Sequence, residues 1–358
     1  MRPLKATINH QALLNNLDCV KRMASKSKVM AVLKANAYGH SLLDVAKTLN
    51  TADGFAVLSI DEAATLKENF PNHTLLLLEG LFEKDEVNAA SKLGINVTIH
   101  NQRQIDIIDD VKPDIPINIH LKINTGMNRL GFIPNEINYL LESLNSNPYI
   151  GDIVLMTHFA TADEATGIEK QFTIFNNIAD NYNYAASVAN SAAIIKYPES
   201  RLDWVRPGIM LYGLSPFEEK SLTEIGLTPA MSLTSEIIAI QEIKAGDSVG
   251  YGLDFKSDKS MKIGIVACGY ADGYPRHARI GTPVAIDGKL SSLVGRVSMD
   301  MLYVDISKIP NVNIGSKVEL WGEQVTADLV AQFSGTVGYE LICAVSASKR
   351  VPLRSINA

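Results

Sequence analysis

The sequence predicts an α/β fold class, with an N-terminal (β/α)8 TIM barrel followed by a C-terminal domain that consists mainly of β-strands. Three observations support this prediction: the length of the chain, the alternation of apolar runs with helical patterns in its first two thirds, and a change to short alternating segments after Gly226. With 358 residues, of which 46% are hydrophobic, the chain exceeds the size at which one core keeps growing. We therefore expect two domains, covering residues 1–226 and 227–358.

Eight short apolar runs in the first domain have the length and continuity of strands that are buried on both faces. Between most of them lie helical patterns, such as residues 60–70 and 135–144, with helix starts expected at Asp61 and at the Pro134–Asn135 pair. Eight strands alternating with helices is the count of a (β/α)8 barrel, whereas a doubly wound sheet, the alternative, usually has fewer strands. The runs cover residues 29–33, 55–58, 75–78, 97–99, 117–123, 153–156, 185–188 and 204–212.

The segments after Gly226 alternate between apolar and polar residues, as strands with one buried face do. They cover residues 232–243, 261–269, 282–306 and 317–322, and the Asp287–Gly288 pair predicts a hairpin turn. The first residues of the chain read as a strand followed by a helix, and this strand could pair with either domain.

Composition excludes several classes of partner. A formal charge of −6 and a pI near 5.7 argue against nucleic acid and against an anionic membrane surface. The opening MRPLKATINH lacks the apolar core of a secretory signal, and no later apolar run is long enough to span a bilayer. The three cysteines have no metal-type spacing. We expect a cytoplasmic protein with a small soluble substrate and no metal.

Several polar residues lie where a barrel gathers its chemistry, at the carboxyl ends of strands. Lys34 follows the first apolar run without a break, and Arg206 lies in the eighth run. Lys122 shares a strand face with His120 and Asn124, so its side chain should point into the barrel mouth. An isolated lysine at a strand end more often reaches for water, so this interpretation depends on the residues taken together.

Six segments of the chain resemble the bacterial alanine racemases, a family of barrel-type enzymes that depend on pyridoxal 5'-phosphate. The segments follow the order of that family and extend over most of the chain. They are AVLKANAYGH (31–40), HLKINTGMNRLG (120–131), MTHFATAD (156–163), RPGIMLYG (206–213), GYADGYPR (269–276) and GRVSMDM (295–301).

The resemblance implies an isomerase that interconverts L-alanine and D-alanine and supplies D-alanine for cell-wall peptidoglycan. It implies that Lys34 carries the cofactor as an imine, and that Lys34 and Tyr251 are the two bases, one on each face of the substrate. It also implies a homodimer in which Tyr251 reaches the partner's active site, and a first strand that joins the C-terminal domain.

The resemblance assigns further residues to binding roles. Arg129 and Met299 contact the substrate, Lys122 is carbamylated in many members, and Tyr270 and Arg296 line the access corridor. The remaining cofactor contacts are Tyr38, His158, Ser191, Arg206, Gly208, Ile209 and Tyr339.

Three of these assignments also have a physical reason. An arginine such as Arg206 only donates hydrogen bonds, so it leaves a pyridine nitrogen unprotonated, weakens the electron sink and suppresses transamination. A carbamate on Lys122 is an anion that could pair with Arg129. Gly208 and Ile209 should offer free backbone N–H groups to a phosphate.

Two residues depart from the family pattern: Asn124 stands where aspartate is frequent, and Ser298 where cysteine is common.

Other functions also remain open. Histidines near strand ends, with a carbamylated lysine, fit a metal-dependent hydrolase of the amidohydrolase type, although its His-x-His motif is replaced here by Lys34-Ala35-Asn36. A non-catalytic pyridoxal-phosphate carrier and a barrel-type decarboxylase are the other two alternatives. The three histidines are His100, His120 and His158.

Overall fold

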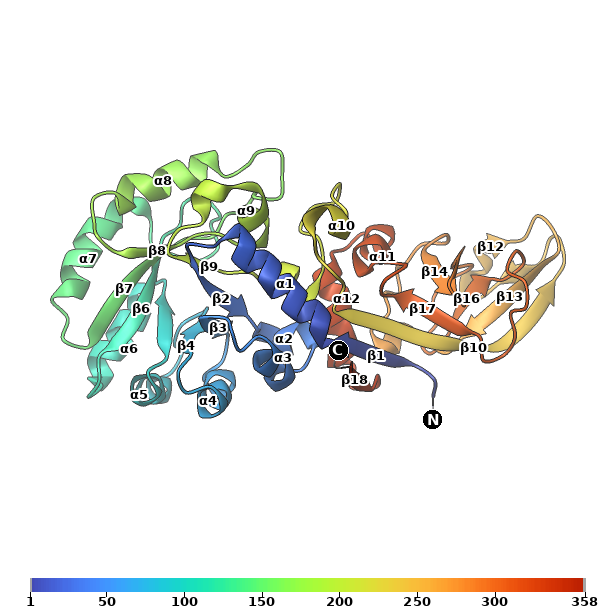
Figure 1. Cartoon of the computed structure of the whole chain (residues 1–358), viewed down its shortest axis with the longest axis horizontal. Coiled ribbons are helices and arrows are strands. Elements are labelled where there is room, and N and C mark those ends of the chain that lie inside the picture. The colour runs from blue at the N-terminus through green and yellow to red at the C-terminus, as the bar shows by residue number, and fades with distance from the viewer. Residues whose placement is uncertain (1, 357–358) are drawn as a thin grey trace. The chain divides into compact units, whose positions relative to one another are not determined.

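A computed structural model describes residues 2–356 of the chain, which divide into two compact units (Figure 1). One unit contains Leu17–Ala37 and Leu42–Leu211 and is called the barrel unit here. The other contains the chain before Leu17, Tyr38–Ser41 and the chain after Leu211, and is called the sheet unit.

The barrel unit is built on a closed barrel of eight parallel strands, which confirms the predicted fold class. The last strand closes on the first through the pairs Lys28↔Trp204 and Val29↔Val205. The strands are β2 (Lys28–Val32), β3 (Gly54–Val57), β4 (Thr74–Leu77), β5 (Asn96–Ile99), β6 (Ile117–Lys122), β7 (Ile150–Met156), β8 (Ala185–Ser187) and β9 (Trp204–Val205).

The eighth run was expected to be a strand over residues 204–212, and this was wrong for most of its length. Strand β9 ends at Val205, and Ile209–Tyr212 form the 3-10 helix η3. Pro207 lies between them and has no N–H for a strand ladder, while its carbonyl accepts a hydrogen bond from Val32 N at 3.0 Å.

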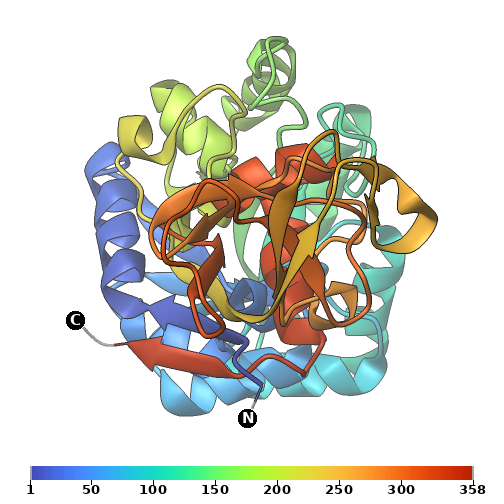
Figure 2. The same cartoon turned by 90° about the vertical axis from the view of Figure 1, so that its right-hand side faces the viewer.

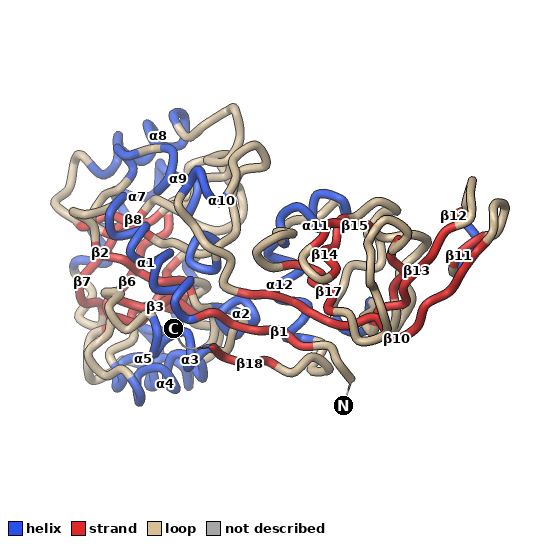
Figure 3. The backbone as a smooth tube through the Cα atoms, turned by 45° about the vertical axis from the view of Figure 1, so that its right-hand side comes forward, coloured by secondary structure: helices blue, strands red, loops and turns tan. Residues whose placement is uncertain are grey.

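Helices separate the strands of the barrel, and Figure 3 shows them in blue beside the red strands. They are α3 (Leu42–Thr48), α4 (Ile60–Asn69), α5 (Lys84–Leu93), α6 (Gln102–Val111), η1 (Pro134–Glu136), α7 (Ile137–Asn145), α8 (Glu169–Ala179), α9 (Ser191–Lys196) and η2 (Pro198–Ser200). The helix start at Pro134 is confirmed. Helix α4 begins at Ile60 rather than Asp61, because Ser59 caps it by accepting a hydrogen bond from Glu62 N.

An eight-stranded sheet forms the core of the sheet unit. Its order is β15-β14-β17-β10-β1-β18, with β13 beside β10 and β16 beside β13. Strand β1 pairs antiparallel with β10 and parallel with β18, so the first strand of the chain belongs to this sheet. Figure 2 shows β18 in red beside β1 in blue. The strands are β1 (Lys5–Asn9), β10 (Met231–Ile243), β13 (Met261–Val266), β14 (Pro283–Ile286), β15 (Lys289–Ser292), β16 (Leu302–Asp305), β17 (Lys317–Trp321) and β18 (Leu353–Ile356).

The predicted hairpin turn is confirmed: Asp287 and Gly288 join β14 to β15, with φ of 44° and 80°.

Strands β11 (Ser248–Val249) and β12 (Phe255–Lys256) form a separate pair. The remaining helices are α1 (His10–Met23), α2 (Lys34–Gly39), α10 (Leu222–Ile225), η4 (Tyr251–Leu253), η5 (Tyr270–Asp272), α11 (Ala327–Ser334) and α12 (Gly338–Ala347).

Within residues 2–356, no single helix has the length and apolar character that a bilayer crossing needs. Helices α11 and α12 reach that length and apolar character only together, as a bent pair, and by length and composition alone.

Candidate active site

Lys34 begins helix α2 directly after the buried run that ends at Leu33. This helix has an unusual hand, because residues 35–38 all have φ between 50° and 55°. A left-handed turn costs an L-residue roughly 1–2 kcal/mol. Two hydrogen bonds support it, from Ala37 N to Leu33 O at 2.8 Å and from Leu42 N to Asn36 Oδ1 at 2.9 Å.

Arg206 lies inside the barrel, where its side chain is held by acceptors from the ends of neighbouring strands. It is 5% exposed, and burial lowers its pKa to about 10, which leaves it charged at neutral pH. Its guanidinium donates to Ser187 Oγ and to the carbonyl of Thr157, both at 2.6 Å, and lies 3.5 Å from His158 Nδ1. None of these partners is a carboxylate, so the contacts fix the guanidinium and leave its charge unneutralised.

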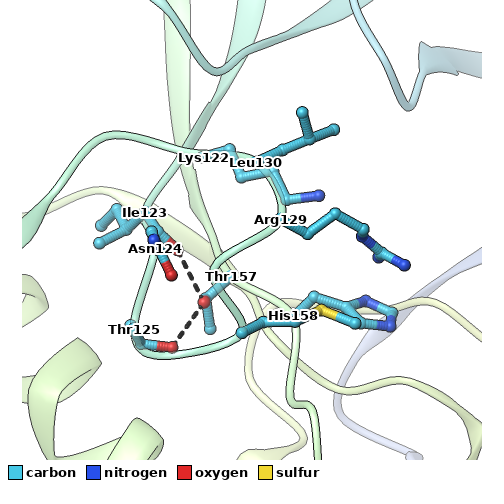
Figure 4. A pocket seen from close by; sticks show the side chains of 9 residues that line it. Lys122, Ile123, Asn124, Thr125, Arg129, Leu130, Thr157 and His158 are labelled. Carbon is cyan, nitrogen blue, oxygen red and sulfur yellow. Dashed lines mark hydrogen bonds between the residues drawn. The ribbon is translucent and has the colours of Figure 1, made fainter.

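The side chains of Lys122, Arg129 and His158 meet in a small pocket in the same unit (Figure 4). Figure 4 shows all three extending to the same side of the loop after β6. The pocket is lined by Lys122, Ile123, Asn124, Thr125, Met127, Arg129, Leu130, Thr157 and His158. The structure therefore brings together one predicted substrate contact, Arg129, one predicted cofactor contact, His158, and Lys122, from two neighbouring strand ends.

Positive charge dominates the electrostatics of this pocket. Burial, followed by the charges of Arg206, Arg129 and Lys34, lowers the pKa of Lys122 to about 8. Burial and the same cations, with Lys122, hold the pKa of His158 well below its usual value, so its imidazole is neutral. The carboxylate of Glu79 acts in the opposite direction on Lys122. An anionic ligand would relieve the repulsion among these cations.

Several residues that support the site were not predicted. Thr157 Oγ1 donates to Ile123 O and hydrogen-bonds Thr125 Oγ1, both at 2.8 Å, so it ties the loop after β6 to the end of β7. Gln171 extends this network by donating to Thr125 Oγ1 at 3.3 Å. Thr157 and Ser187 could have been found as polar residues at the carboxyl ends of strands, but a single Ser or Thr there is a weak signal.

Ser191 and the loop after β9 form a second group in the barrel unit. Ser191 Oγ accepts hydrogen bonds from Gly208 N at 3.0 Å and from Met210 N at 3.4 Å. The prediction that Gly208 offers a free N–H was therefore wrong, because the serine hydroxyl occupies it. Ile209 begins η3 next to this bond. The arrangement still gathers a hydroxyl and backbone N–H groups at one place, the donors that a phosphate uses.

Aromatic rings pack around Tyr38 within the sheet unit. The ring of Tyr38 lies 4.8 Å from that of Tyr212 and 5.7 Å from that of Tyr339. Burial raises the pKa of Tyr38, and Cys343 adds to the rise, so its phenol stays protonated and can donate. Tyr339 is 37% exposed. Sequence reasoning missed Tyr212, which is fully buried and looked like part of an apolar run.

The other predicted residues of the sheet unit lie on turns. Tyr251 is 72% exposed at the start of η4, and Arg296 forms an ion pair with Asp254 of the same turn. Residue 252 favours glycine because its φ is +76°, a backbone conformation that L side chains rarely adopt.

Tyr270 and Met299 are brought together on neighbouring segments of the same unit. Tyr270 N donates to Ser298 O at 3.1 Å, and Ala271 N donates to Met299 O at 3.0 Å. The side chain of Met299 is 53% exposed.

The histidines do not form a metal site. Across the described residues, no group of three or more His, Cys, Asp or Glu side chains is arranged to hold a metal ion. His100 Nε2 donates to Glu79 O at 3.0 Å and its Nδ1 accepts from Asn101 Nδ2 at 3.1 Å, while His120 is buried within β6. The competing metal-hydrolase interpretation therefore has no ligand set in this part of the chain.

Comparisons with known proteins cover nearly the whole chain. The family model described as alanine racemase, N-terminal domain, matches residues 8–216, and the one described as alanine racemase, C-terminal domain, matches residues 230–354. The chain is 48% identical over 348 residues to an alanine racemase of Nitrosospira multiformis, covering 96% of this chain and 98% of that protein. It is also 48% identical to one of Paraburkholderia phytofirmans, covering 99% of each.

Solved structures show the same similarity. The biosynthetic alanine racemase from Pseudomonas aeruginosa superposes with a TM-score of 0.96 at 44% identity, covering 99% of this chain and 100% of that one. The alanine racemase from Acinetobacter baumannii gives a TM-score of 0.94 at 42% identity, with the same coverage.

Proposed function

The chain belongs to the alanine racemase family, and from that premise we propose that it interconverts L-alanine and D-alanine by moving one proton at Cα of the substrate. It is an isomerase, and its D-alanine would serve cell-wall peptidoglycan. The observation that carries the proposal is the match of both domains over nearly the full length, together with a cationic pocket at the barrel mouth.

The residues present fit pyridoxal 5'-phosphate, an anionic aromatic cofactor. Lys34 at the strand exit would hold it covalently, and Arg206 would donate to its ring nitrogen, with His158 against the ring. Its phosphate would be held by Tyr38, Ser191, Ile209 and Tyr339, a set rich in hydroxyl groups. When bound, this cofactor supplies an electron sink that acidifies Cα of an amino acid.

Two bases would act on opposite faces of the substrate. The amine of Lys34, released when substrate takes its place, would exchange the proton on one face, and the phenol of Tyr251 from the partner subunit would exchange it on the other. Arg206 retains its own proton because its pKa stays near 10, and this limits the electron sink and favours return of the proton to Cα. Arg129 and Met299 would orient the substrate, with Tyr270 and Arg296 along its access corridor.

Lys122 is proposed to carry a carbamate. Because its pKa is about 8, a larger fraction of the Lys122 amine is neutral at physiological pH than for a lysine with the ordinary pKa of 10.5. The neutral amine is the form that attacks CO2. The new N–C bond gives a carbamate anion and releases one proton. The anion would pair with Arg129 and reduce the repulsion among the cations of the pocket. Peptide mass mapping at neutral pH should find CO2 added to Lys122.

We also propose a homodimer with shared active sites and a cytosolic location. The side chain of Tyr251 is 72% exposed, and this supports the dimer. A catalytic phenol acts in a site that excludes water, and the turn that carries Tyr251 does not bury it. The chain has only three cysteines, an odd number, and two of them are buried, which fits a protein of a reducing compartment.

The activity is tested with purified protein loaded with pyridoxal phosphate, by chiral chromatography of the products from L-alanine and D-alanine separately. We expect both to reach the same racemic mixture. Borohydride reduction followed by peptide mapping should then place the pyridoxyl group on Lys34. Label on another lysine would contradict the assignment of Lys34, and absence of racemisation would contradict the proposed activity itself.

A further inference from the structure

A buried carboxylate in the sheet unit joins segments from both ends of the chain. Asp272 is 0% exposed, and its Oδ1 accepts from Arg2 Nη1 at 2.6 Å and lies 3.4 Å from Arg350 Nε. Its Oδ2 accepts from Gly269 N at 3.0 Å. A buried carboxylate with two arginine partners and a backbone donor is fixed in position, since removing any partner would expose an unpaired charge.

The same two arginines also hold the neighbouring loop. Arg2 Nη2 donates to Asp300 O, and Arg350 Nη2 donates to Asp300 Oδ1, both at 2.6 Å. The loop that they hold contains Ser298 and Met299, and it accepts backbone hydrogen bonds from the turn that contains Asp272. The ion pairs therefore clamp two adjacent segments together at their outer edge.

The turn from Gly269 to Gly273 is packed tightly on two sides. A Cβ at Gly269 would overlap the carbonyl of Met299 on one side. At Gly273, where φ is +94°, a Cβ would lie 2.6 Å from the backbone of Ala344 in helix α12. Helix α12 also carries Tyr339. One turn thus contacts the loop of Met299 and the helix of Tyr339, and it contains Tyr270 itself.

We infer that Asp272 is a positioning residue for the racemase site. It acts through the turn that it anchors, and it sets the places of Tyr270, Met299 and Tyr339, which the proposed function assigns to the access corridor, the substrate and the phosphate. The inference rests on that proposed function for the roles of these three residues. The ion pairs themselves do not, because they are geometric features of the sheet unit.

Asp272→Asn tests the inference, because the amide oxygen can still accept from Gly269 N while the charge that attracts both arginines is lost. We expect KM for alanine to rise about tenfold with a smaller change in kcat, since small displacements of positioning groups have effects of this size. In hydrogen exchange, the amides of Tyr270 and Ala271 should exchange roughly tenfold faster, while those of β10 and β13 keep their wild-type rates.

Glu242→Gln is the matched control, since it removes an exposed ion pair with Lys262 from the same unit and should change neither readout. If Asp272→Asn does not fold, Arg350→Gln is the second variant: it removes the longer ion pair of Asp272 together with the pair between Arg350 and Asp300, and it leaves the shorter pair between Asp272 and Arg2. The amides of Tyr270 and Ala271 should again exchange faster than in the wild type, by a smaller factor than in Asp272→Asn. Wild-type KM together with unchanged exchange at Tyr270 and Ala271 in a folded variant would overturn the inference. An inactive wild-type protein would instead contradict the proposed function, and the exchange measurement would still decide whether Asp272 holds the turn.

Discussion

At the level of single residues, the barrel mouth is organised by repulsion among cations. Lys34, Lys122, Arg129 and Arg206 all act on the imidazole of His158, and each disfavours its protonated form. Arg206 is held among neutral acceptors, so the protein supplies little compensating negative charge of its own. The site is therefore preorganised for anionic ligands, and we expect bound phosphate and carboxylate groups to stabilise the barrel as well as to react there.

Exchanging the charge at Arg206 should change the reaction outcome. In Arg206→Glu, a carboxylate beside the ring nitrogen would support its protonated form and strengthen the electron sink. We expect racemisation to fall by about a hundredfold or more, and transamination to rise relative to it. Pyruvate formation measured against D-alanine formation gives the ratio. Arg206→Lys keeps the positive donor and serves as the control, and a Glu variant with the wild-type ratio would show that the arginine has another role.

His120 should make the barrel sensitive to acid. Burial, followed by the charge of Arg206, lowers the pKa of His120 from 6.5 to about 3. Between these two values the unfolded chain binds more protons than the folded one, so the free energy of unfolding falls as pH falls from 6.5 toward 3. The contribution is at most about 1.4 kcal/mol for each pH unit in that window.

The variant His120→Phe has no group to protonate, so its melting temperature should fall less between pH 6.5 and pH 4 than that of the wild type. His277→Gln, at an exposed position, is the control and should follow the wild-type curve. Parallel curves for His120→Phe and the wild type would show that this imidazole does not contribute to acid sensitivity.

At the level of elements, the left-handed helix α2 ends at a glycine that no other residue can replace without strain. Gly39 has φ of +81°, and a Cβ there would lie 2.5 Å from Ile342 O and 3.0 Å from Ser346 Cβ in helix α12. We expect Gly39→Ala to lower the free energy of unfolding by about 1–3 kcal/mol, which is the cost of an enforced backbone strain.

Gly335→Ala separates the two causes of that loss. Gly335 also has a positive φ, of +64°, but a Cβ there would meet nothing within 4 Å. Its substitution should therefore cost only the free energy of holding an alanine at a positive φ. The melting temperature should fall less than in Gly39→Ala. Equal losses in the two variants would show that the contact with helix α12 has no effect of its own.

The sequence predicted those elements whose signal is local. Buried parallel strands appear as apolar runs, so the barrel and its order could be predicted, and Asp287–Gly288 specified its own turn. The length of strand β9 was overestimated, because the eighth apolar run continues past Pro207, whereas the strand ends before this proline. The hand of α2 could not be predicted, since two of its residues are alanines and local propensity favours a right-handed helix; tertiary contacts decide it.

The site could be predicted in the same uneven way. Lys34, Lys122 and Arg206 were found because a cation after an apolar strand is uncommon, and the structure gathers their charges around one pocket. Ser187 and Thr157 were missed because a hydroxyl residue at a strand end is common and acquires its role only through a contact with a distant residue.

At the level of the whole molecule, the sheet unit leaves several large apolar side chains exposed. Tyr251, Leu253 and Met299 are 72%, 66% and 53% exposed, and two of the three are predicted site residues. Exposed apolar groups that also carry chemistry are typical of surfaces that a partner covers. We therefore expect the protein to be a dimer at assay concentrations, with these side chains protected from solvent.

Shared sites have a consequence that neither variant alone can show. Lys34→Ala and Tyr251→Ala homodimers should each be nearly inactive, because every site lacks one base. When the two variants are unfolded, mixed and refolded with cofactor, each heterodimer contains one site that lacks both bases and one site that is intact. With random pairing, roughly a quarter of all sites should then be wild-type-like, since two-fold symmetry gives each dimer two equivalent composite sites. Each variant refolded by itself is the control, and heterodimers that form without regaining activity would mean that Tyr251 serves its own chain or is not a base.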